Sequence, residues 1–134
     1  MTVTAEQDAY LRHHRWALIA TIGVSGGPQV TMVAYHWDGH DVVMSIRRTT
    51  VKWRNVLARP QVCVTVAEGE QCLSLYGRAE AIETDPERAE LTDRLLASLQ
   101  PAHAAILAAD IAAGLDATDR VIVRLTPTRA VGRI

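Results

Sequence analysis

The sequence predicts a mainly β domain with helices, of the α+β class, in which six antiparallel strands close into a barrel. Its 134 residues suffice for about one domain, so we expect residues 1–134 to form a single unit. Short runs of β-branched and aromatic residues alternate with Gly-Gly and Asp-Gly turns, as in hairpins. Both faces of these runs are largely apolar, so the barrel interior covers one face and a second subunit is expected to cover the other.

The N-terminal part is predicted to form one helix followed by a three-stranded meander. Tyr10 and Leu11 are apolar among polar neighbours, which indicates a short amphipathic helix that packs on an end of the barrel. The predicted ranges are residues 4–15 for the helix and residues 16–23, 29–37 and 41–47 for the strands.

A second helix is predicted after the meander, over residues 50–58. Apolar residues recur there at i, i+3 and i+4 from Trp53. Thr49 or Thr50 is expected to cap its N-terminus, and Pro60 follows its end.

The C-terminal half is predicted to contain a hairpin, two helices and a last strand. Pro101 separates the helices and Gly114 is expected to close the second one. The residues after Pro127 are expected to form a tail. The predicted ranges are 61–67 and 72–82 for the hairpin, 86–99 and 102–113 for the helices, and 120–126 for the strand.

Positive charge is concentrated in residues 45–60, which carry five basic side chains and no acid in a chain of net charge −1. The segment includes the start of the predicted helix over residues 50–58, where free backbone N–H groups favour an anion. One interpretation is therefore a phosphate-binding site, and the alternative is a solvated basic loop. Nucleic acid is not expected as a partner, because the chain is mildly acidic and carries no helix-turn-helix or stacking motif.

Other features argue against several classes of protein. No apolar run approaches the ~20 residues of a membrane span, and the N-terminus lacks the apolar core of a secretory signal, so we expect a cytoplasmic protein without a membrane partner. The histidines show no metal-ligand spacing, and no metal site is expected. Cys63 and Cys72 are expected to be buried free thiols, because the hairpin would place Cys72 opposite Val66.

An ordered set of short motifs runs through nearly the whole chain. It consists of Ala20-Thr21, Gly26-Gly27-Pro28-Gln29-Val30, Val33-x-Tyr35-x-Trp37-Asp38-Gly39, Ser45-x4-Thr50-x-Lys52-x2-Asn55-Val56-x3-Pro60-x-Val62 and Leu75-x-Gly77-x-Ala79. This set resembles the pyridoxamine 5'-phosphate oxidase-like split β-barrel superfamily, and within it most the actinobacterial flavin/deazaflavin oxidoreductase group B. The resemblance implies a six-stranded antiparallel split barrel and a homodimer with cofactor sites at the subunit interface. It also implies coenzyme F-420, a deazaflavin, or FMN in related branches.

The resemblance also assigns cofactor-binding residues. Lys52 matches the phosphate-binding lysine of the superfamily and Thr50 the hydroxyl residue two positions before it, while Gln29 and Ser45 match positions near the ring and its side chain. Together with the other residues of the basic stretch, the expected set is Gln29, Ser45, Arg47, Arg48, Thr49, Thr50, Lys52 and Arg54.

Two departures from the resemblance favour the deazaflavin over FMN. The FMN-dependent oxidases carry a basic residue at the position of Gln29 and a lysine at that of Ala34. Losing both removes charges that hold an FMN phosphate, each worth about 1.5–3 kcal/mol. The dispersed cations instead suit a phosphodiester with a polyglutamate tail.

The resemblance implies a reductase that transfers a hydride from reduced coenzyme F-420 to an activated double bond of a small organic substrate. The cofactor carries the chemistry, and a proton then comes from water or a side chain. Tyr35, His36 and Tyr76 are the candidate proton donors by residue type, although aromatic residues on strands more often pack than react. The alternatives are an FMN-dependent oxidoreductase and a protein that binds a flavin, deazaflavin or tetrapyrrole without turnover.

Overall fold

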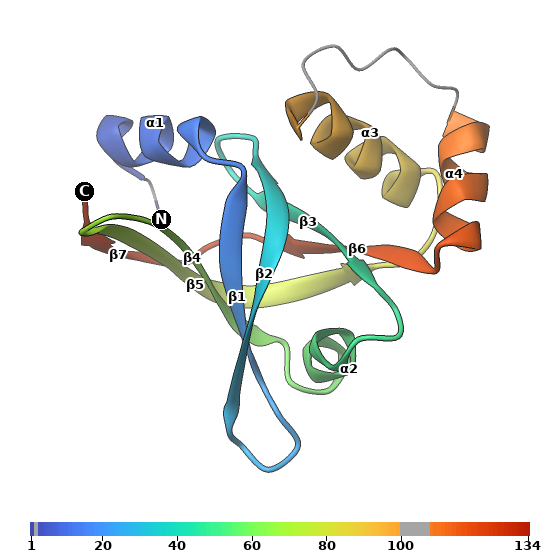
Figure 1. Ribbon diagram of the computed structural model, residues 1–134, viewed down its shortest axis with the longest axis horizontal. Coiled ribbons are helices and arrows are strands. Elements are labelled where there is room, and N and C mark those ends of the chain that lie inside the picture. Colours follow the sequence, from blue (N-terminus) through green and yellow to red (C-terminus); the bar gives the residue numbers. More distant parts are fainter. Residues whose placement is uncertain (2, 100–107) are drawn as a thin grey trace.

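A computed structural model describes residue 1, residues 3–99 and residues 108–134. Four helices and seven strands follow one another along these residues (Figure 1). The helices are α1 (Ala5–His13), α2 (Val51–Ala58), α3 (Glu87–Leu99) and α4 (Ala108–Ala117). The strands are β1 (Trp16–Ile22), β2 (Pro28–Trp37), β3 (Val42–Arg47), β4 (Gln61–Glu68), β5 (Gln71–Ile82), β6 (Arg120–Leu125) and β7 (Arg129–Arg133).

Six antiparallel strands close into a barrel, as predicted. Their order is β4-β1-β2-β3-β6-β5, and β5 pairs back with β4 to complete the ring. The residues after Pro127 were predicted to form a tail, but Arg129–Arg133 form a strand. Residues of β7 pair with β5, with Arg129 opposite Tyr76 and Arg133 opposite Cys72.

The barrel interior is filled by the alternate side chains that each strand directs inward. Ile19, Met44 and Leu75 are among its fully buried members. Helix α1 covers one end with Leu11, and Trp37 donates a hydrogen bond from Nε1 to Asp8 of this helix over 2.9 Å. Helix α1 thus covers the end of the barrel at which β2 ends.

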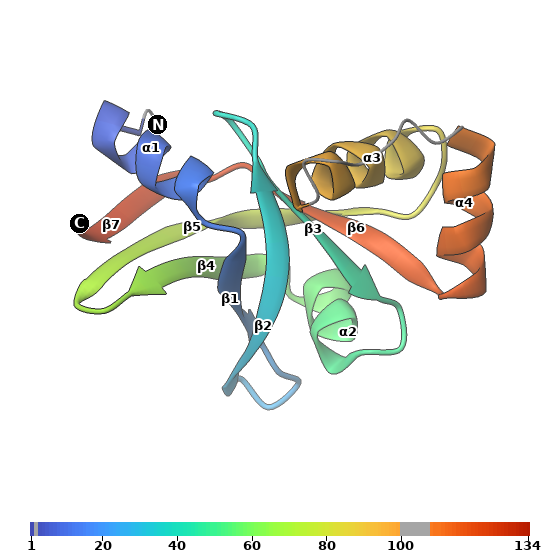
Figure 2. The same ribbon diagram turned by 45° about the horizontal axis from the view of Figure 1, so that its top comes forward.

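A second layer, formed by α3 and α4, covers the outside of the barrel, where α3 packs on β2, β3 and β6 and α4 packs on β6 (Figures 1 and 2). Arg88 of α3 is almost fully buried at the junction of these elements. Its guanidinium contacts the carboxylates of Asp85 and Asp116 at 2.8 Å each and donates to the backbone oxygen of Arg120 at 3.1 Å. This contact ties the helical layer to the start of β6.

The end of α4 differs from the prediction. The predicted helix began at residue 102, which lies outside the described residues, and it was expected to stop at Gly114. The helix continues through Gly114 to Ala117. Its end is set instead by Thr118, whose N–H and hydroxyl both donate to the Gly114 oxygen, and by Asp119, which has a positive φ of 54°. Helix α1 ends at His13, two residues before its predicted end.

The two cysteines are free thiols, as predicted, but both are half-buried where full burial was expected. Cys72 lies opposite Ala67 and Cys63 opposite Tyr76, so the hairpin register differs by one position from the prediction. In the described part of the chain, no helix has the length and apolar character that crossing a membrane requires.

Candidate functional site

A cavity of about 290 Å³ contains half of the predicted cofactor-binding residues. We call it the basic cavity, because three of its side chains are cationic and none is acidic. An uncompensated group of cations produces a positive potential that attracts anions. The cavity is lined by Trp16, Met32, Val33, Ala34, Ser45, Ile46, Arg47, Thr50, Lys52 and Arg120.

The turn from β3 into α2 positions the polar side of the basic cavity. Thr50 is the N-cap residue of α2, but its hydroxyl donates to the Arg47 oxygen at 2.8 Å and does not cap the helix. The first-turn N–H groups of α2 therefore have no side-chain cap. Free N–H groups at a helix start are suited to an anion, and Lys52 lies in this same turn.

Arg120 brings a cation from the far end of the sequence. It starts β6 and pairs with Arg47, the last residue of β3. Burial lowers the pKa of Lys52, and the positive charge of Arg120 lowers it further. The two cations are thus close enough to repel each other, and a bound anion would relieve that repulsion.

Arg120 was not among the residues predicted from the sequence, although it lines the basic cavity. Knowledge of the strand pairing would identify Arg120. This residue begins β6, and it reaches the basic cavity because β6 pairs with β3. The sequence does not show which strands pair.

Arg48, Thr49 and Arg54 were predicted to bind the cofactor, but they do not line the basic cavity. Arg48 instead forms ion pairs with Glu83 at 2.6 Å and with Asp119 at 3.1 Å. Thr49 and Arg54 are exposed on the surface.

Gln29 also lies apart from the basic cavity, in a polar cluster beneath α2. Its side-chain oxygen is 3.5 Å from both the Thr21 hydroxyl and the Asn55 amide nitrogen. Asn55 and Thr21 are buried and share a hydrogen bond of 3.1 Å. This cluster joins α2 to the β1–β2 hairpin. It therefore holds α2, the helix that carries Lys52, against the barrel.

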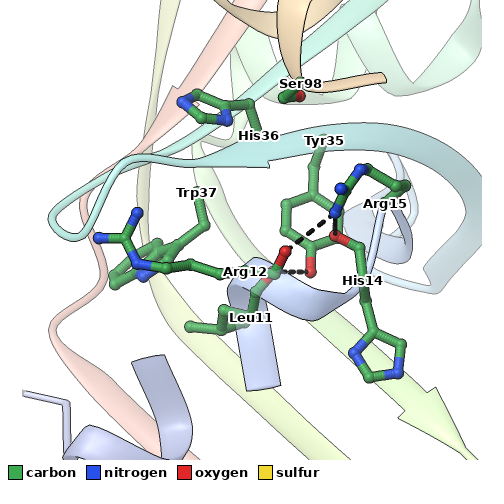
Figure 3. Close-up of a pocket in the computed structure, with 8 residues that line it drawn as sticks. All are labelled: Leu11, Arg12, His14, Arg15, Tyr35, His36, Trp37 and Ser98. Atoms are coloured by element: carbon green, nitrogen blue, oxygen red, sulfur yellow. Dashed lines mark hydrogen bonds between the residues drawn. The ribbon is translucent and has the colours of Figure 1, made fainter. Parts of the chain in front are cut away.

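The three candidate proton donors lie outside the basic cavity. Tyr35 and His36 line one cavity together, and Tyr76 lines another. Tyr35 is buried and donates its hydroxyl proton to the Leu11 oxygen at 2.6 Å, and burial raises its pKa. Tyr76 lines a different cavity, with the Arg129 guanidinium 4.4 Å from its ring centroid. The cavity that His36 shares with Tyr35 lies near the end of α3 (Figure 3).

An exposed apolar surface borders the basic cavity on β1 and β2. Trp16 is 59% exposed and Met32 is 63% exposed, and both also line the basic cavity. We call this surface the apolar face. It consists of Trp16, Leu18, Val30 and Met32, which the register of β1 against β2 places side by side. Large exposed side chains gathered in this way are typical of an interaction surface.

Among the described residues, no group of three or more histidine, cysteine, aspartate or glutamate side chains is placed to hold a metal ion. What the basic cavity offers is cations, hydroxyl groups and an apolar wall. This set suits a ligand with an anionic part and an apolar part.

Comparisons with known proteins agree with the fold. No curated protein sequence matches the chain. Among solved structures, a conserved hypothetical protein of Mycobacterium tuberculosis has a TM-score of 0.81 at 20% identity, over 98% of this chain and 84% of the other. A structure named F420 reductase has a TM-score of 0.69 at 27% identity, over 96% and 98% of the two chains. HutZ, the heme storage protein of Vibrio cholerae, has a TM-score of 0.71 at 19% identity, over 98% and 94%.

The family model of pyridoxamine 5'-phosphate oxidase matches residues 3–132, which is almost the whole chain. The match agrees with the closed six-stranded barrel and with the motifs along the sequence. The chain therefore belongs to the pyridoxamine 5'-phosphate oxidase family of split β-barrels.

Proposed function

We propose that the protein is a coenzyme F-420-dependent reductase that acts on an activated double bond of a small organic substrate. The observation that carries the proposal is the basic cavity, where Arg47, Lys52 and Arg120 meet without an acidic neighbour in the lining. The F420 reductase at 27% identity over nearly the full length of both chains supports the same cofactor.

The residues of the basic cavity fit the anionic part of this cofactor. Arg47, Lys52 and Arg120 would hold its phosphodiester, and the uncapped first turn of α2 adds backbone N–H donors. The Thr50 hydroxyl is already committed to the Arg47 oxygen, so Thr50 shapes the turn. Ala34, which replaces the lysine of the FMN-dependent relatives, lies in the same wall, so this wall lacks the extra charge of those relatives.

A second copy of the chain would complete the site. The basic cavity of about 290 Å³ is at the lower limit for a cofactor pocket, so one chain accommodates only part of such a ligand. The apolar face continues from its edge through Trp16 and Met32. A partner packed on this face would bury these side chains and close the wall over the ring of the cofactor.

The bound cofactor supplies hydride chemistry, and the residues of this chain bind it, orient it and exclude water. Tyr35 holds its proton in the hydrogen bond to Leu11 and is assigned a structural role. His36 and Tyr76 line other cavities. We therefore propose that water provides the proton that follows the hydride.

Two alternatives differ from this proposal in the ligand or in turnover. In the first, FMN would have to bind without the two cations that the FMN-dependent relatives carry at the positions of Gln29 and Ala34. In the second, the protein would bind its ligand without turnover. The heme storage protein HutZ has a similar fold, but at 19% identity the similarity concerns the fold alone.

The proposal is tested by titrating the purified protein with coenzyme F-420 and with FMN at two salt concentrations, following ligand fluorescence. We expect F-420 to bind more tightly than FMN, and to bind more weakly at high salt. Reduced F-420 is then mixed with an electron-poor alkene, and its oxidation is followed by absorbance. Tighter FMN binding would contradict the deazaflavin assignment, binding without any turnover would favour a carrier, and no binding of either cofactor would refute the proposal.

A further inference from the structure

A second cationic cavity, of about 160 Å³, lies between the end of α1, β2 and the C-terminal end of α3 (Figure 3). We call it the His36 cavity. Arg12, Arg15, His36 and Ser98 are polar members of its lining, and Tyr35 and Trp37 contribute aromatic surface. It shares no lining residue with the basic cavity.

Arg15 retains unused donors in the His36 cavity. Its Nη1 donates to the Arg12 oxygen at 2.9 Å and to the His14 oxygen at 3.3 Å. Within the described residues it has no carboxylate partner and makes no hydrogen bond from Nε or Nη2. An arginine carries five N–H donors in a planar fork that matches an oxyanion, so several donors are left for a ligand.

The other polar side chains differ in what they can offer. Arg12 is partly neutralised, because its Nε pairs with Asp8 at 2.8 Å. The Ser98 hydroxyl already donates to the Leu95 oxygen at 2.8 Å, so it can only accept a further hydrogen bond. The His36 ring is half-buried and has no hydrogen-bond partner in the described part of the chain. An unpaired ring nitrogen at a cavity is available to a ligand.

The charges around His36 are predominantly positive. Burial lowers the pKa of His36, the cations Arg12, Arg94 and Arg15 lower it as well, and Asp38 raises it. His36 is therefore neutral near pH 7, and its protonation adds a further positive charge. An anion placed among these groups would offset their mutual repulsion.

We propose that the His36 cavity binds a small oxyanion, either a phosphate or a carboxylate group, held by Arg15, Arg12 and the imidazole of His36. Its volume equals that of about five waters at ~30 Å³ each, which is enough for one such group but too little for a whole cofactor. The anion binds most tightly when His36 is protonated, so the affinity for an anion of fixed charge rises as the pH falls. The site is independent of the proposed cofactor and lies outside the basic cavity.

The experiment follows the His36 ring by NMR in the protein without added cofactor, so failure of F-420 binding would leave this test intact. The signal is assigned by its loss in His36→Gln. Titrations from pH 5 to pH 8 are compared in sodium phosphate, sodium acetate and sodium chloride of equal ionic strength. Phosphate is expected to raise the pKa of His36 above its value in chloride. A matching rise in acetate would show that carboxylates also bind, whereas identical titrations in all three salts would overturn the proposal.

Variants separate specific binding from general screening. Arg15→Ala should weaken phosphate binding roughly tenfold, as expected for loss of a charge-assisted hydrogen bond. Arg78→Ala removes the same charge from an exposed position outside the His36 cavity and should leave phosphate binding unchanged. Because Arg15 also bonds two backbone oxygens, Arg15→Lys serves as a second variant that keeps the charge, and it should bind more tightly than Arg15→Ala. Equal binding by Arg15→Ala and the unmodified protein would overturn the proposal.

Discussion

The Nη1 atom of Arg120 lies 3.4 Å from the hydroxyl oxygen of Ser45, although 75 residues separate them in the sequence. The same nitrogen is 3.5 Å from the Ser45 backbone oxygen. This contact crosses the β3–β6 pair and holds the arginine beside the predicted phosphate site. The last strand of the barrel ring thus contributes to a site that otherwise comes from the first half of the chain.

Replacing Arg120 by glutamine should raise the pKa of Lys52. The arginine charge is the second cause of the lowered pKa and burial is the first, so the pKa should rise and still stay below its ordinary value. The measurement is an NMR titration of the Lys52 side chain, with Arg78→Gln as control. An unchanged pKa in Arg120→Gln would mean that the two cations do not share the basic cavity.

Replacing Lys52 by alanine should weaken coenzyme F-420 binding by about 1–3 kcal/mol, because a charge-assisted hydrogen bond is lost. Arg54→Ala is the matched control, since it removes a cation from the same helix outside the basic cavity. Fluorescence titration gives both dissociation constants, and circular dichroism checks that the fold is intact. Equal effects of the two substitutions would indicate general electrostatic attraction.

Replacing Met32 by glutamate should prevent the proposed dimer from forming. It places a charge in the middle of the apolar face, where a partner would have to desolvate it. Val24→Glu is the control, because Val24 is 90% exposed in the β1–β2 turn and outside this face. Sedimentation gives the mass of each protein in solution. A dimer that survives Met32→Glu would place the interface elsewhere.

Replacing Asn55 by alanine should lower the free energy of unfolding by about 1–3 kcal/mol, because the buried Thr21 hydroxyl loses the amide group that donates to it. Urea denaturation measures the loss. Leu57→Ala serves as control on the same helix, where the side chain is exposed. If Asn55→Ala lowers the free energy of unfolding no more than Leu57→Ala does, the polar cluster does not hold α2 in place.

The contact of Arg88 with Asp85 should make stability depend on pH. The Arg88 hydrogen bond lowers the pKa of Asp85 below its ordinary value of about 3.9. The carboxylate therefore stabilises the folded protein above that value, and this stabilisation is lost as the pH falls through the lower folded pKa. Urea denaturation between pH 3 and pH 7 should show that the free energy of unfolding falls less on acidification in Asp85→Asn than in the unmodified protein. Glu70→Gln, at an exposed position, should follow the unmodified protein.

The local patterns of the sequence predicted most of the fold. Alternating apolar residues and glycine turns identified the six barrel strands, and the period of the segment around Trp53 identified α2. The strand β7 was missed because Arg129–Arg133 has little apolar alternation and is held mainly by pairing with β5. A short edge strand of this kind depends on its neighbour, which the sequence does not reveal.

Four of the eight predicted cofactor residues line the basic cavity, and their proximity along the chain explains why they lie together. Ser45, Arg47, Thr50 and Lys52 belong to one turn between β3 and α2, where local geometry brings them together. Arg48 instead pairs with two carboxylates, Glu83 before α3 and Asp119 in the turn after α4, and these long-range contacts have no local signal in the sequence.

Among the described strands, β5 alone pairs with three others. Residues 71–78 pair with β4 along one edge, and the other edge takes β7 and then β6. An inserted residue would turn every later side chain to the opposite face, and in this strand it would disturb several pairings together. The turn between β1 and β2 has no such constraint, since Gly26 and Gly27 have open space around them. Changes in chain length during evolution are therefore expected in that hairpin loop, while the length of β5 stays fixed.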